Sequence, residues 1–270
     1  MIIDFHTHIF PDRIANATIS ALSENASIPP HSNGAYDGLN DSMRRAGVDI
    51  SVNLPVVTRP TQFDSITAFA SQINQKAGTF PRVISFAGIH PDDDDYECHL
   101  ESVKKMGFLG IKLHPDYQGV FFDDERYIRI LKKAKELDLI TVTHAGFDGA
   151  FVGQEIKCTP RRAVNALDKI GGYGKLVFAH MGANELFDEV YSTLAGENVY
   201  FDTSYVLPHI KKELFFKIIE KHSEDKILFA TDSPWQGQKE QISILKSYSL
   251  GDVVENKIFY ENASKLLKLN

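Results

Sequence analysis

Residues 1–10, MIIDFHTHIF, join an apolar run to two histidines that are two positions apart, His6 and His8. If residues 2–8 form a β-strand, alternate side chains lie on one face, with their α-carbons about 6.6–6.8 Å apart. Two imidazoles at that spacing can bind one metal ion at roughly 2.0–2.1 Å from each nitrogen. The pair alone is a weak signal, so a metal site requires further ligands from the rest of the chain.

Seven more short apolar or β-branched runs follow, separated by longer segments with helical periodicity. The candidate strands are 2–6, 48–54, 82–88, 108–113, 139–143, 175–179, 198–203 and 226–230. The candidate helices are 37–46, 62–77, 94–106, 124–138, 160–170, 184–195, 208–222 and 236–247, then a tail helix near 252–268. Strict alternation predicts parallel βαβ units. Eight units predict an α/β protein with a single (β/α)8 TIM barrel over residues 1–270, and an open doubly wound sheet is the alternative.

The amino-acid composition excludes several classes of partner and indicates a cellular compartment. With 36 acidic and 29 basic residues, the net charge is −7 and the pI is near 5.8. Sequence-independent nucleic-acid binding depends on Lys and Arg at phosphates, so we expect no nucleic-acid partner. No apolar segment is long enough to span a bilayer, so we expect no membrane partner. Two cysteines, Cys98 and Cys158, suit a reducing compartment. We see no signal peptide and expect a cytoplasmic protein.

Six of the candidate strands run directly into side chains that can bind metals or move protons. These side chains are His6 and His8, His90, Lys112 and His114, His144, His180, and Asp232. In a parallel barrel the carboxyl ends of all strands lie on one rim, where the loops build active sites. Residues from most of the chain therefore converge, which predicts a metal site there. We interpret the remaining histidines, His31, His99, His209 and His222, as structural.

The chain resembles the amidohydrolase superfamily of metal-dependent hydrolases. The nearest branch is the amidohydrolase-related one, which also includes enzymes similar to aminocarboxymuconate semialdehyde decarboxylase. The matching motifs, in family order, are DFHTH, GIHP, GIKLHPDYQG followed by FFDDE, THAG, FAHMG and FATDSPW. The GIHP motif also looks like TatD-type deoxyribonucleases. That family places a metal-binding Glu near the end of the fourth strand, where this chain has Lys112.

The resemblance implies that His6, His8 and Asp232 bind one metal ion. His144 would be a fourth ligand or a ligand of a second ion. His180 would either bind metal or act as a catalytic group that polarises the substrate or orients water. Asp232 would also be the general base for a metal-bound water. Such ligands suit zinc, and manganese, iron or nickel is compatible.

Lys112 leaves the number of metal ions open. The run IKLHP resembles a strand of some dihydroorotases, in which the lysine is carboxylated and bridges two ions. Alternatively, Lys112 binds a substrate carboxylate as an ammonium group. His90 and His114 either contact substrate or cap the turns beside them, and Asp4 is expected to orient an imidazole. We expect specificity from the loops 9–36, 114–122 and 145–158, with aromatic walls from Tyr36, Tyr117, Phe121, Phe147, Phe151 and Trp235.

The resulting functional hypothesis is metal-dependent hydrolysis of a C–N or C–O bond in a small organic substrate, such as an amide, lactone or ester. The alternative is non-oxidative decarboxylation at a mononuclear site. A third candidate is a TatD-like phosphodiesterase, which Lys112 and the acidic composition disfavour. The resemblance also makes a homodimer an option, since dimers are common in such families.

Overall fold

Short parallel strands alternate with helices along the computed structural model, which describes residues 1–76 and 78–269. The strands are β1 (Ile3–Thr7), β2 (Ile50–Asn53), β3 (Arg82–Ser85), β4 (Ala87–Gly88), β5 (Gly110–Leu113), β6 (Ile140–Thr143), β7 (Leu176–Phe178), β8 (Tyr200–Asp202) and β9 (Ile227–Leu228). All eight predicted strands are present in order. The predicted strand 82–88 is divided into β3 and β4 at Phe86.

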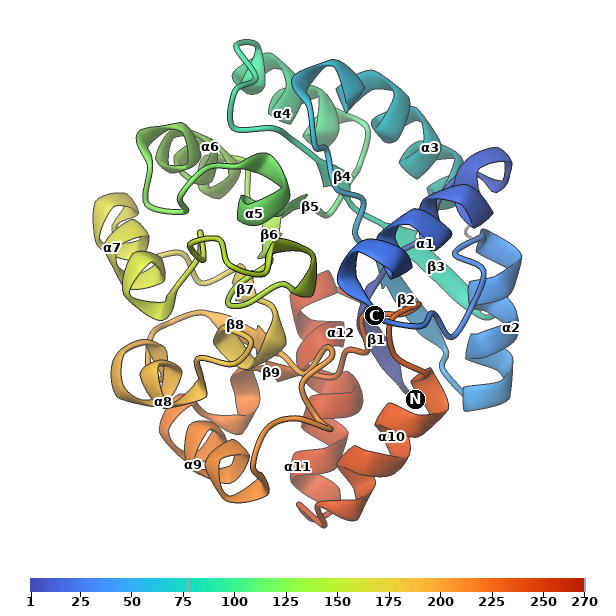
Figure 1. Ribbon diagram of the computed structural model, residues 1–270, viewed down its shortest axis with the longest axis vertical. Coiled ribbons are helices and arrows are strands. Elements are labelled where there is room, and N and C mark those ends of the chain that lie inside the picture. Colours follow the sequence, from blue (N-terminus) through green and yellow to red (C-terminus); the bar gives the residue numbers. More distant parts are fainter. Residues whose placement is uncertain (77, 270) are drawn as a thin grey trace.

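The strands form a ring with the helices outside it (Figure 1). Their pairing is parallel and follows the chain, in the orders β1-β2-β3 and β4-β5-β6-β7-β8-β9. Backbone hydrogen bonds link β9 and its exit to β1: Phe5 N donates to Phe229 O at 2.9 Å, and Asp232 N donates to His6 O at 2.8 Å. The predicted (β/α)8 barrel is therefore confirmed, and the doubly wound alternative is wrong because its strand order would reverse.

Twelve α-helices lie within the described residues. They are α1 (Asp12–Ala26), α2 (Tyr36–Ala46), α3 (Phe63–Gln75), α4 (Tyr96–Lys105), α5 (Pro115–Gln118), α6 (Glu125–Glu136), α7 (Pro160–Ile170), α8 (Phe187–Glu189), α9 (Lys212–His222), α10 (Gln238–Ser247), α11 (Asp252–Asn256) and α12 (Asn262–Leu267). Shorter 3₁₀ or π turns are η1 (Pro60–Gln62), η2 (Gly149–Phe151), η3 (His180–Gly182), η4 (Val190–Leu194), η5 (Glu224–Lys226) and η6 (Lys257–Glu261). The predicted end of helix 62–77 lies outside the described residues.

The sequence prediction treated residues 9–36 as a loop. This is wrong for Asp12–Ala26, which form helix α1. Only Ala15 and Ile19 of this helix are buried, so its core-facing side is narrow. Ile14 and Leu22 face a cavity instead of the core. A helix whose apolar residues face a cavity lacks the clear core-facing stripe that sequence reasoning depends on.

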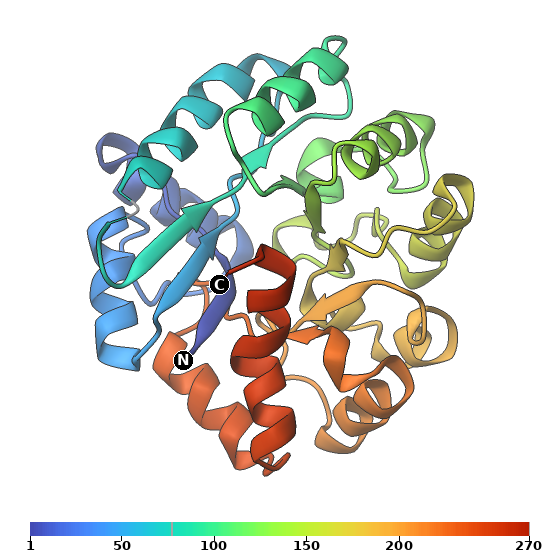
Figure 2. The same ribbon diagram turned by 180° about the vertical axis from the view of Figure 1, so that it is seen from behind.

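The barrel interior is apolar at one end and closed by the C-terminal helix. Ile3 and Phe5 of β1 pack there with side chains from the other strands and with Leu266 and Leu267 of α12. In Figure 2 the red C-terminal helices lie across this end of the ring. A second, larger apolar cluster fills the space between the strands and the outer helices. Because this apolar packing closes one end of the barrel, the polar residues lie at the opposite rim, at the carboxyl ends of the strands.

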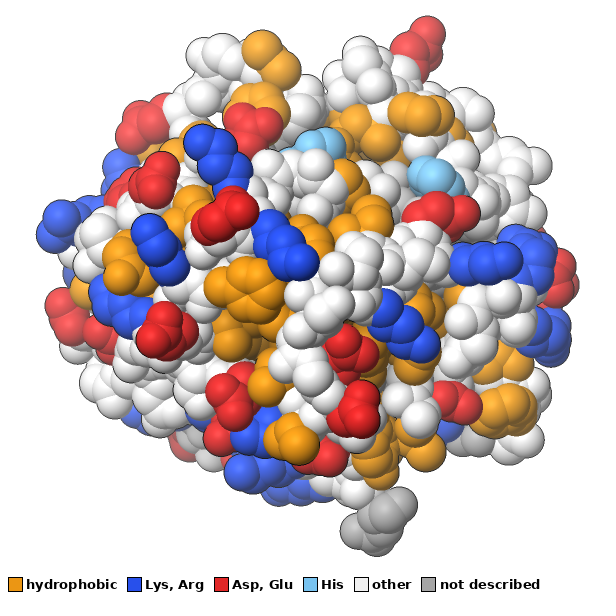
Figure 3. Space-filling model, turned by 90° about the horizontal axis from the view of Figure 1, so that it is seen from below, with side chains coloured by type: hydrophobic (Ala, Val, Ile, Leu, Met, Phe, Trp, Pro, Cys, Tyr) orange, Lys and Arg blue, Asp and Glu red, His pale blue; other side chains and the backbone are white. Residues whose placement is uncertain are grey.

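Charges of both signs are mixed on the outer surface. On the face in Figure 3, acidic and basic side chains alternate with apolar ones and do not gather in a patch of one sign. Within the described part of the chain, every helix is too short or too polar to cross a bilayer.

Candidate metal centre and active site

A β-bulge in β1 directs the first histidines into the barrel. The pairing of β1 with β2 shifts register between Asp4 and Thr7, so one extra residue is accommodated in β1. After the bulge, His6 and His8 face the cavity at the rim, whereas Thr7 donates to Val52 O. Asp4 faces the other way and accepts from Gln238 of α10 at 2.8 Å. Bulges commonly re-aim side chains beside active sites, and this one separates Asp4 from the histidines.

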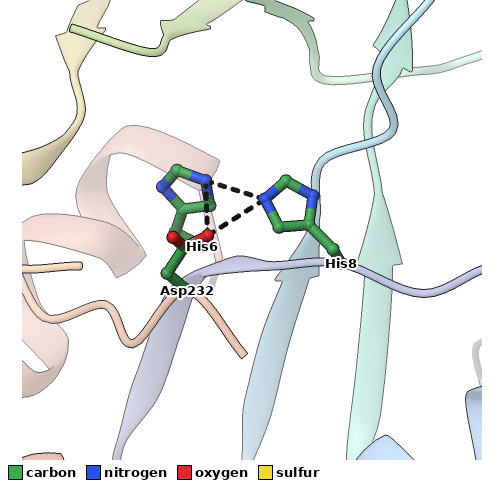
Figure 4. Close-up of side chains that lie close together, drawn as sticks. All are labelled: His6, His8 and Asp232. Carbon is green, nitrogen blue, oxygen red and sulfur yellow. Dashed lines mark hydrogen bonds and ion pairs between the residues drawn. The ribbon is translucent and has the colours of Figure 1, made fainter. Parts of the chain in front are cut away.

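His6, His8 and Asp232 form a compact three-ligand cluster (Figure 4). The two histidine Nε2 atoms are 3.2 Å apart, and Asp232 Oδ1 lies 3.4 Å from the first and 3.1 Å from the second. Ligand atoms around a tetrahedral ion at about 2.1 Å are about 3.4 Å apart. The cluster therefore has the dimensions of a three-ligand metal site.

Hydrogen bonds on the far side of each ring determine which nitrogen faces this site. His6 Nδ1 lies 2.9 Å from Asp202 Oδ2, and His8 Nδ1 lies 2.9 Å from Leu54 O. Both partners are acceptors, so each Nδ1 carries the hydrogen and each Nε2 is bare. Two bare nitrogens 3.2 Å apart repel unless a cation lies between them. This arrangement fits a divalent metal and is the usual way in which outer partners orient metal-binding histidines.

His180 and His144 form a second nitrogen pair beside the first. His180 Nδ1 lies 2.9 Å from Ser204 O, so its bare Nε2 faces the site. His144 Nδ1 lies 3.0 Å from that Nε2. Lys112 also lines this cavity, and its Nζ donates to His6 Nε2 at 2.9 Å. The structure thus brings together every residue that the sequence predicted as a metal ligand, although their binding of metal remains a prediction.

Burial and neighbouring charges shift the protonation of these groups. Burial would raise the pKa of Asp232, but His6 and His8 outweigh that effect and hold it below its usual value. Burial, followed by the Lys112 charge, lowers the pKa of His6 to about 4. Burial lowers the pKa of Lys112 to about 8. At neutral pH the cluster therefore contains neutral His6, ionised Asp232 and a mostly protonated lysine with a substantial neutral fraction.

Two site residues have a left-handed backbone. The φ angle is 61° at His180, two residues after β7, and 64° at Asp232, four residues after β9. Non-glycine residues in this region cost about 1–3 kcal/mol each and persist where the surrounding structure determines them. The sharp turn at each strand end directs these side chains toward the cluster.

The cluster lies at the base of a cavity of about 870 Å³. Its outer walls are largely apolar, with Ile14 and Leu22 of α1, Ile66 and Phe69 of α3, and Val152 after η2. Among the predicted aromatic wall residues, Tyr117, Phe147 and Trp235 line the cavity. The other three lie elsewhere: Tyr36 against Thr79, Phe121 under Arg162, and Phe151 behind Tyr117.

A second group, His114, His144 and Asp148, also has ligand atoms within 4.8 Å of one another. However, the His114 and His144 rings are stacked, with centroids 4.2 Å apart and planes within 6°. Imidazole nitrogens direct their lone pairs in the ring plane, so stacked rings direct them along parallel lines and not at one ion. His114 instead faces Asp148, with 3.4 Å between Nε2 and Oδ2. We do not consider this group a metal site.

The structure differs from the expectation for Asp4 and favours one of the two alternatives for His90. Asp4 was expected to orient an imidazole, but its carboxylate binds Thr231, Gln238 and the backbone of His6. This expectation is wrong because the bulge turns Asp4 away from the rings. His90 is buried and its Nδ1 accepts from Asp92 N at 3.0 Å, outside the residues that line the cavity. The geometry therefore supports a role for His90 in capping its own turn.

Sequence reasoning missed Asp202, which orients His6 and also accepts from His180 N at 3.0 Å. The signal was present, since Asp202 is a polar residue at the end of a predicted strand. It also missed Asp116 and Asp148, which lie in the loops after β5 and β6. No periodic pattern marks such loop residues, and only the fold brings them to the site.

A parallel barrel with a histidine and carboxylate cluster at its C-terminal rim is an architecture of metal-dependent enzymes. A family model described as Amidohydrolase matches residues 3–269, so the chain belongs to the amidohydrolase family. This match confirms the resemblance seen in the motifs. No curated protein matches the sequence.

Solved structures similar to this chain include several decarboxylases. The 2,6-dihydroxybenzoate decarboxylase from Rhizobium matches with a TM-score of 0.71 and 17% identity, over 99% of this chain and 98% of that one. The 5-carboxyvanillate decarboxylase from Sphingomonas paucimobilis has a TM-score of 0.71 and 14% identity, over 100% and 99%. A dihydroxybenzoic acid decarboxylase from Polaromonas, with bound manganese and 2-nitroresorcinol, has a TM-score of 0.69 and 18% identity, over 100% and 97%. At these identities the likeness shows the fold alone.

Proposed function

We propose that this protein is a metal-dependent enzyme that removes CO2, without oxidation, from a small organic acid with an apolar body. The observation that carries the proposal is the position of Lys112. Its Nζ lies beside the three-ligand cluster, 2.9 Å from His6 Nε2, at the base of an apolar-walled cavity. A cation site next to an ammonium group attracts a carboxylate, and the apolar walls suit an aromatic or unsaturated body.

Decarboxylation breaks one C–C bond, releases CO2, and leaves an electron pair on carbon that must then take a proton. A divalent metal held by His6, His8 and Asp232, with His144 as a further ligand, would supply positive charge that stabilises this electron-rich species. Lys112 orients the departing carboxylate and holds a proton, since its pKa is about 8. A group with a pKa near the working pH is an effective proton donor. His180 Nε2, held inward by Ser204, is placed to orient the substrate.

The decarboxylase folds among the similar structures support this reaction over hydrolysis, which was the first hypothesis from the sequence. The support is analogy, because one fold hosts many reactions. The manganese in the Polaromonas enzyme also makes manganese as suitable a candidate as zinc for this ligand set. We propose a small-molecule substrate and no nucleic-acid partner; the homodimer remains a prediction.

Hydrolysis of a C–N or C–O bond is the second candidate, and one observation favours it. The lowered pKa of Lys112 makes a neutral amine available, and a neutral amine can react with CO2 to form a carbamate. Lys112 contacts His6 and lines the same cavity as His8, His144 and His180. A carbamate there could bridge two ions that activate water.

Metal content and product analysis separate these reactions. The purified protein is loaded with manganese or zinc, and the metal-to-chain ratio is measured by elemental analysis together with the intact mass. Panels of hydroxylated aromatic and unsaturated acids are then assayed for CO2 release, and amides, lactones and esters for hydrolysis. We expect one ion per chain, an unmodified Lys112, and CO2 release that a chelator abolishes.

Two ions per chain, a mass increase of one CO2 on Lys112, and hydrolysis without CO2 release would overturn the proposal in favour of the second candidate. Single-stranded DNA serves as a control substrate, and cleavage that depends on Asp232 would favour the phosphodiesterase.

A further inference from the structure

The ring of His144 is oriented differently from the rings of the other three histidines that face the site. His6, His8 and His180 each donate from Nδ1 to an acceptor at 2.9 Å and present Nε2 to the site. His144 is reversed: its Nδ1 faces the site, and its Nε2 points outward. That Nε2 is buried and has no hydrogen-bond partner among the described residues.

A carboxylate oxygen of Asp116, in α5, lies close to this nitrogen. Asp116 Oδ2 lies 3.7 Å from His144 Nε2, and it too is buried without a hydrogen-bond partner in the described part of the chain. The other carboxylate oxygen, Oδ1, accepts from Lys157 N at 3.3 Å, which fixes the orientation of the carboxylate. Two buried polar atoms without hydrogen-bond partners reduce the stability of the fold, so the position of these two next to each other needs a physical cause.

Neither tautomer of His144 satisfies all these atoms without a cation. If Nδ1 carries the hydrogen, it donates to His180 Nε2, but His144 Nε2 and Asp116 Oδ2 then face each other as two acceptors. If Nε2 carries the hydrogen, it faces the Asp116 carboxylate at 3.7 Å, an electrostatic contact longer than a hydrogen bond, but the bare Nδ1 and the bare His180 Nε2 then face each other at 3.0 Å. In the second tautomer a cation at His144 Nδ1 offsets the repulsion between the two bare nitrogens, and the Nε2–H faces the Asp116 carboxylate.

We infer that Asp116 is a positioning residue that holds His144 in the tautomer whose bare Nδ1 binds the metal. The inference rests on the metal centre of the proposed function and is independent of which reaction follows. Asp116 acts through His144, as an acceptor for the Nε2–H that metal binding through Nδ1 requires. The role belongs to a residue of α5 that lies within the motif GIKLHPDYQG, where the sequence assigned it no function.

The substitution Asp116→Asn tests this role. The amide oxygen would take the hydrogen bond from Lys157 N, so the amide NH2 would face His144 Nε2 and donate to it. That contact favours the tautomer that blocks Nδ1. Zinc and manganese affinities are measured by calorimetry on the full chain, and the ring hydrogens of His144 are located by NMR of the zinc-loaded, ¹⁵N-histidine-labelled protein.

We expect the wild type to show a hydrogen on His144 Nε2, and Asp116→Asn to lose about 10–100-fold in metal affinity together with that resonance. Asp116→Glu keeps a carboxylate with a longer reach and is expected to restore most of the affinity. Asp93→Asn is the matched control, because Asp93 is a buried carboxylate that binds His99 at 2.7 Å outside the cavity-lining residues.

Unchanged metal affinity in folded Asp116→Asn, or a wild-type His144 with its hydrogen on Nδ1 in the zinc-loaded protein, would overturn the inference. If Asp116→Asn does not fold, failure of folded Asp116→Glu to bind metal better than an Asp116→Ala variant overturns it instead. If the protein gives the expected results in these tests but releases no CO2, the role of Asp116 stands and only the proposed reaction is wrong.

Discussion

The carboxylate of Asp202 accepts a hydrogen bond from His6 Nδ1 at 2.9 Å, so the end of β8 orients the first histidine of β1. The other oxygen of this carboxylate accepts from His180 N and Ser204 N, each at 3.0 Å. Burial would raise the pKa of Asp202, but the His6 charge and hydrogen bond lower it overall. One buried, ionised side chain therefore determines the orientation of two separate strand ends.

Replacing Asp202 with Asn should weaken metal binding by about 10–100-fold, which is typical when the outer partner of a metal-binding histidine is lost. The amide removes the negative charge that holds His6 in its tautomer. Calorimetric titration of the metal-free protein with zinc or manganese measures the effect. Asp4→Asn is the control: Asp4 is equally buried but contacts no imidazole ring, so its loss should leave the metal affinity unchanged. Equal losses in both variants would contradict the role assigned to Asp202.

The variant Asp232→Asn should retain the fold and lose about 10²–10⁴-fold in turnover of the active substrate, because the charged ligand and proton acceptor is removed. His6→Ala and His8→Ala should lose bound metal, as measured by elemental analysis. His222→Ala is a matched histidine control, since His222 pairs with Val199 O and Gly196 N in the outer layer and should affect stability without loss of metal. Full activity in Asp232→Asn would exclude this site as the catalytic centre.

Metal affinity should rise with pH up to about 8 and then level off. The Lys112 ammonium donates to His6 Nε2 and repels a cation, and burial lowers its pKa to about 8. Below that pH the ion must displace the ammonium from His6 Nε2 and is repelled by its charge, so affinity should rise with pH by less than the tenfold per pH unit that complete loss of the proton would give. Titrations from pH 6 to 9 measure the profile. Lys112→Met, which preserves the length of the side chain, should flatten the slope; an identical slope in the variant would show that another group causes it.

Gly146 should be intolerant of a side chain. Its φ is +88°, and a Cβ atom there would lie 2.1 Å from Asn184 N and 2.5 Å from Ala183 C, which are backbone atoms of the neighbouring loop. Gly146→Ala should therefore destabilise the protein by more than the roughly 1–2 kcal/mol expected for the left-handed backbone alone.

Gly153→Ala provides the comparison for this prediction. Gly153 also has a positive φ, +80°, but its added Cβ would meet no described atom within 4 Å. Urea unfolding of both variants gives the difference in their free energies of unfolding. Equal destabilisation would show that the close approach between Gly146 and Asn184 contributes nothing.

Much of the site was predictable because strand ends in a parallel barrel meet at one rim. The positions of His6, Lys112, His144 and Asp232 followed from that rule and from the order of the strands. Helix α1 was not predicted; its core-facing side is narrow, with only Ala15 and Ile19 buried, and Ile14 and Leu22 face the cavity. Asp116 and Asp148 were missed for a related reason, because loop residues have no repeating geometry.

The amino-acid sequence by itself determined the number and order of the strands and the chemical types of the groups at their ends, because apolar periodicity and parallel pairing are local and repetitive properties. Only the tertiary structure decided the direction of each group. The register shift in β1 turned Asp4 outward and His6 inward, and Asp202, almost two hundred residues away, became the partner of His6. A one-residue shift in register reverses the face that a side chain occupies, and that shift depends on contacts between distant strands.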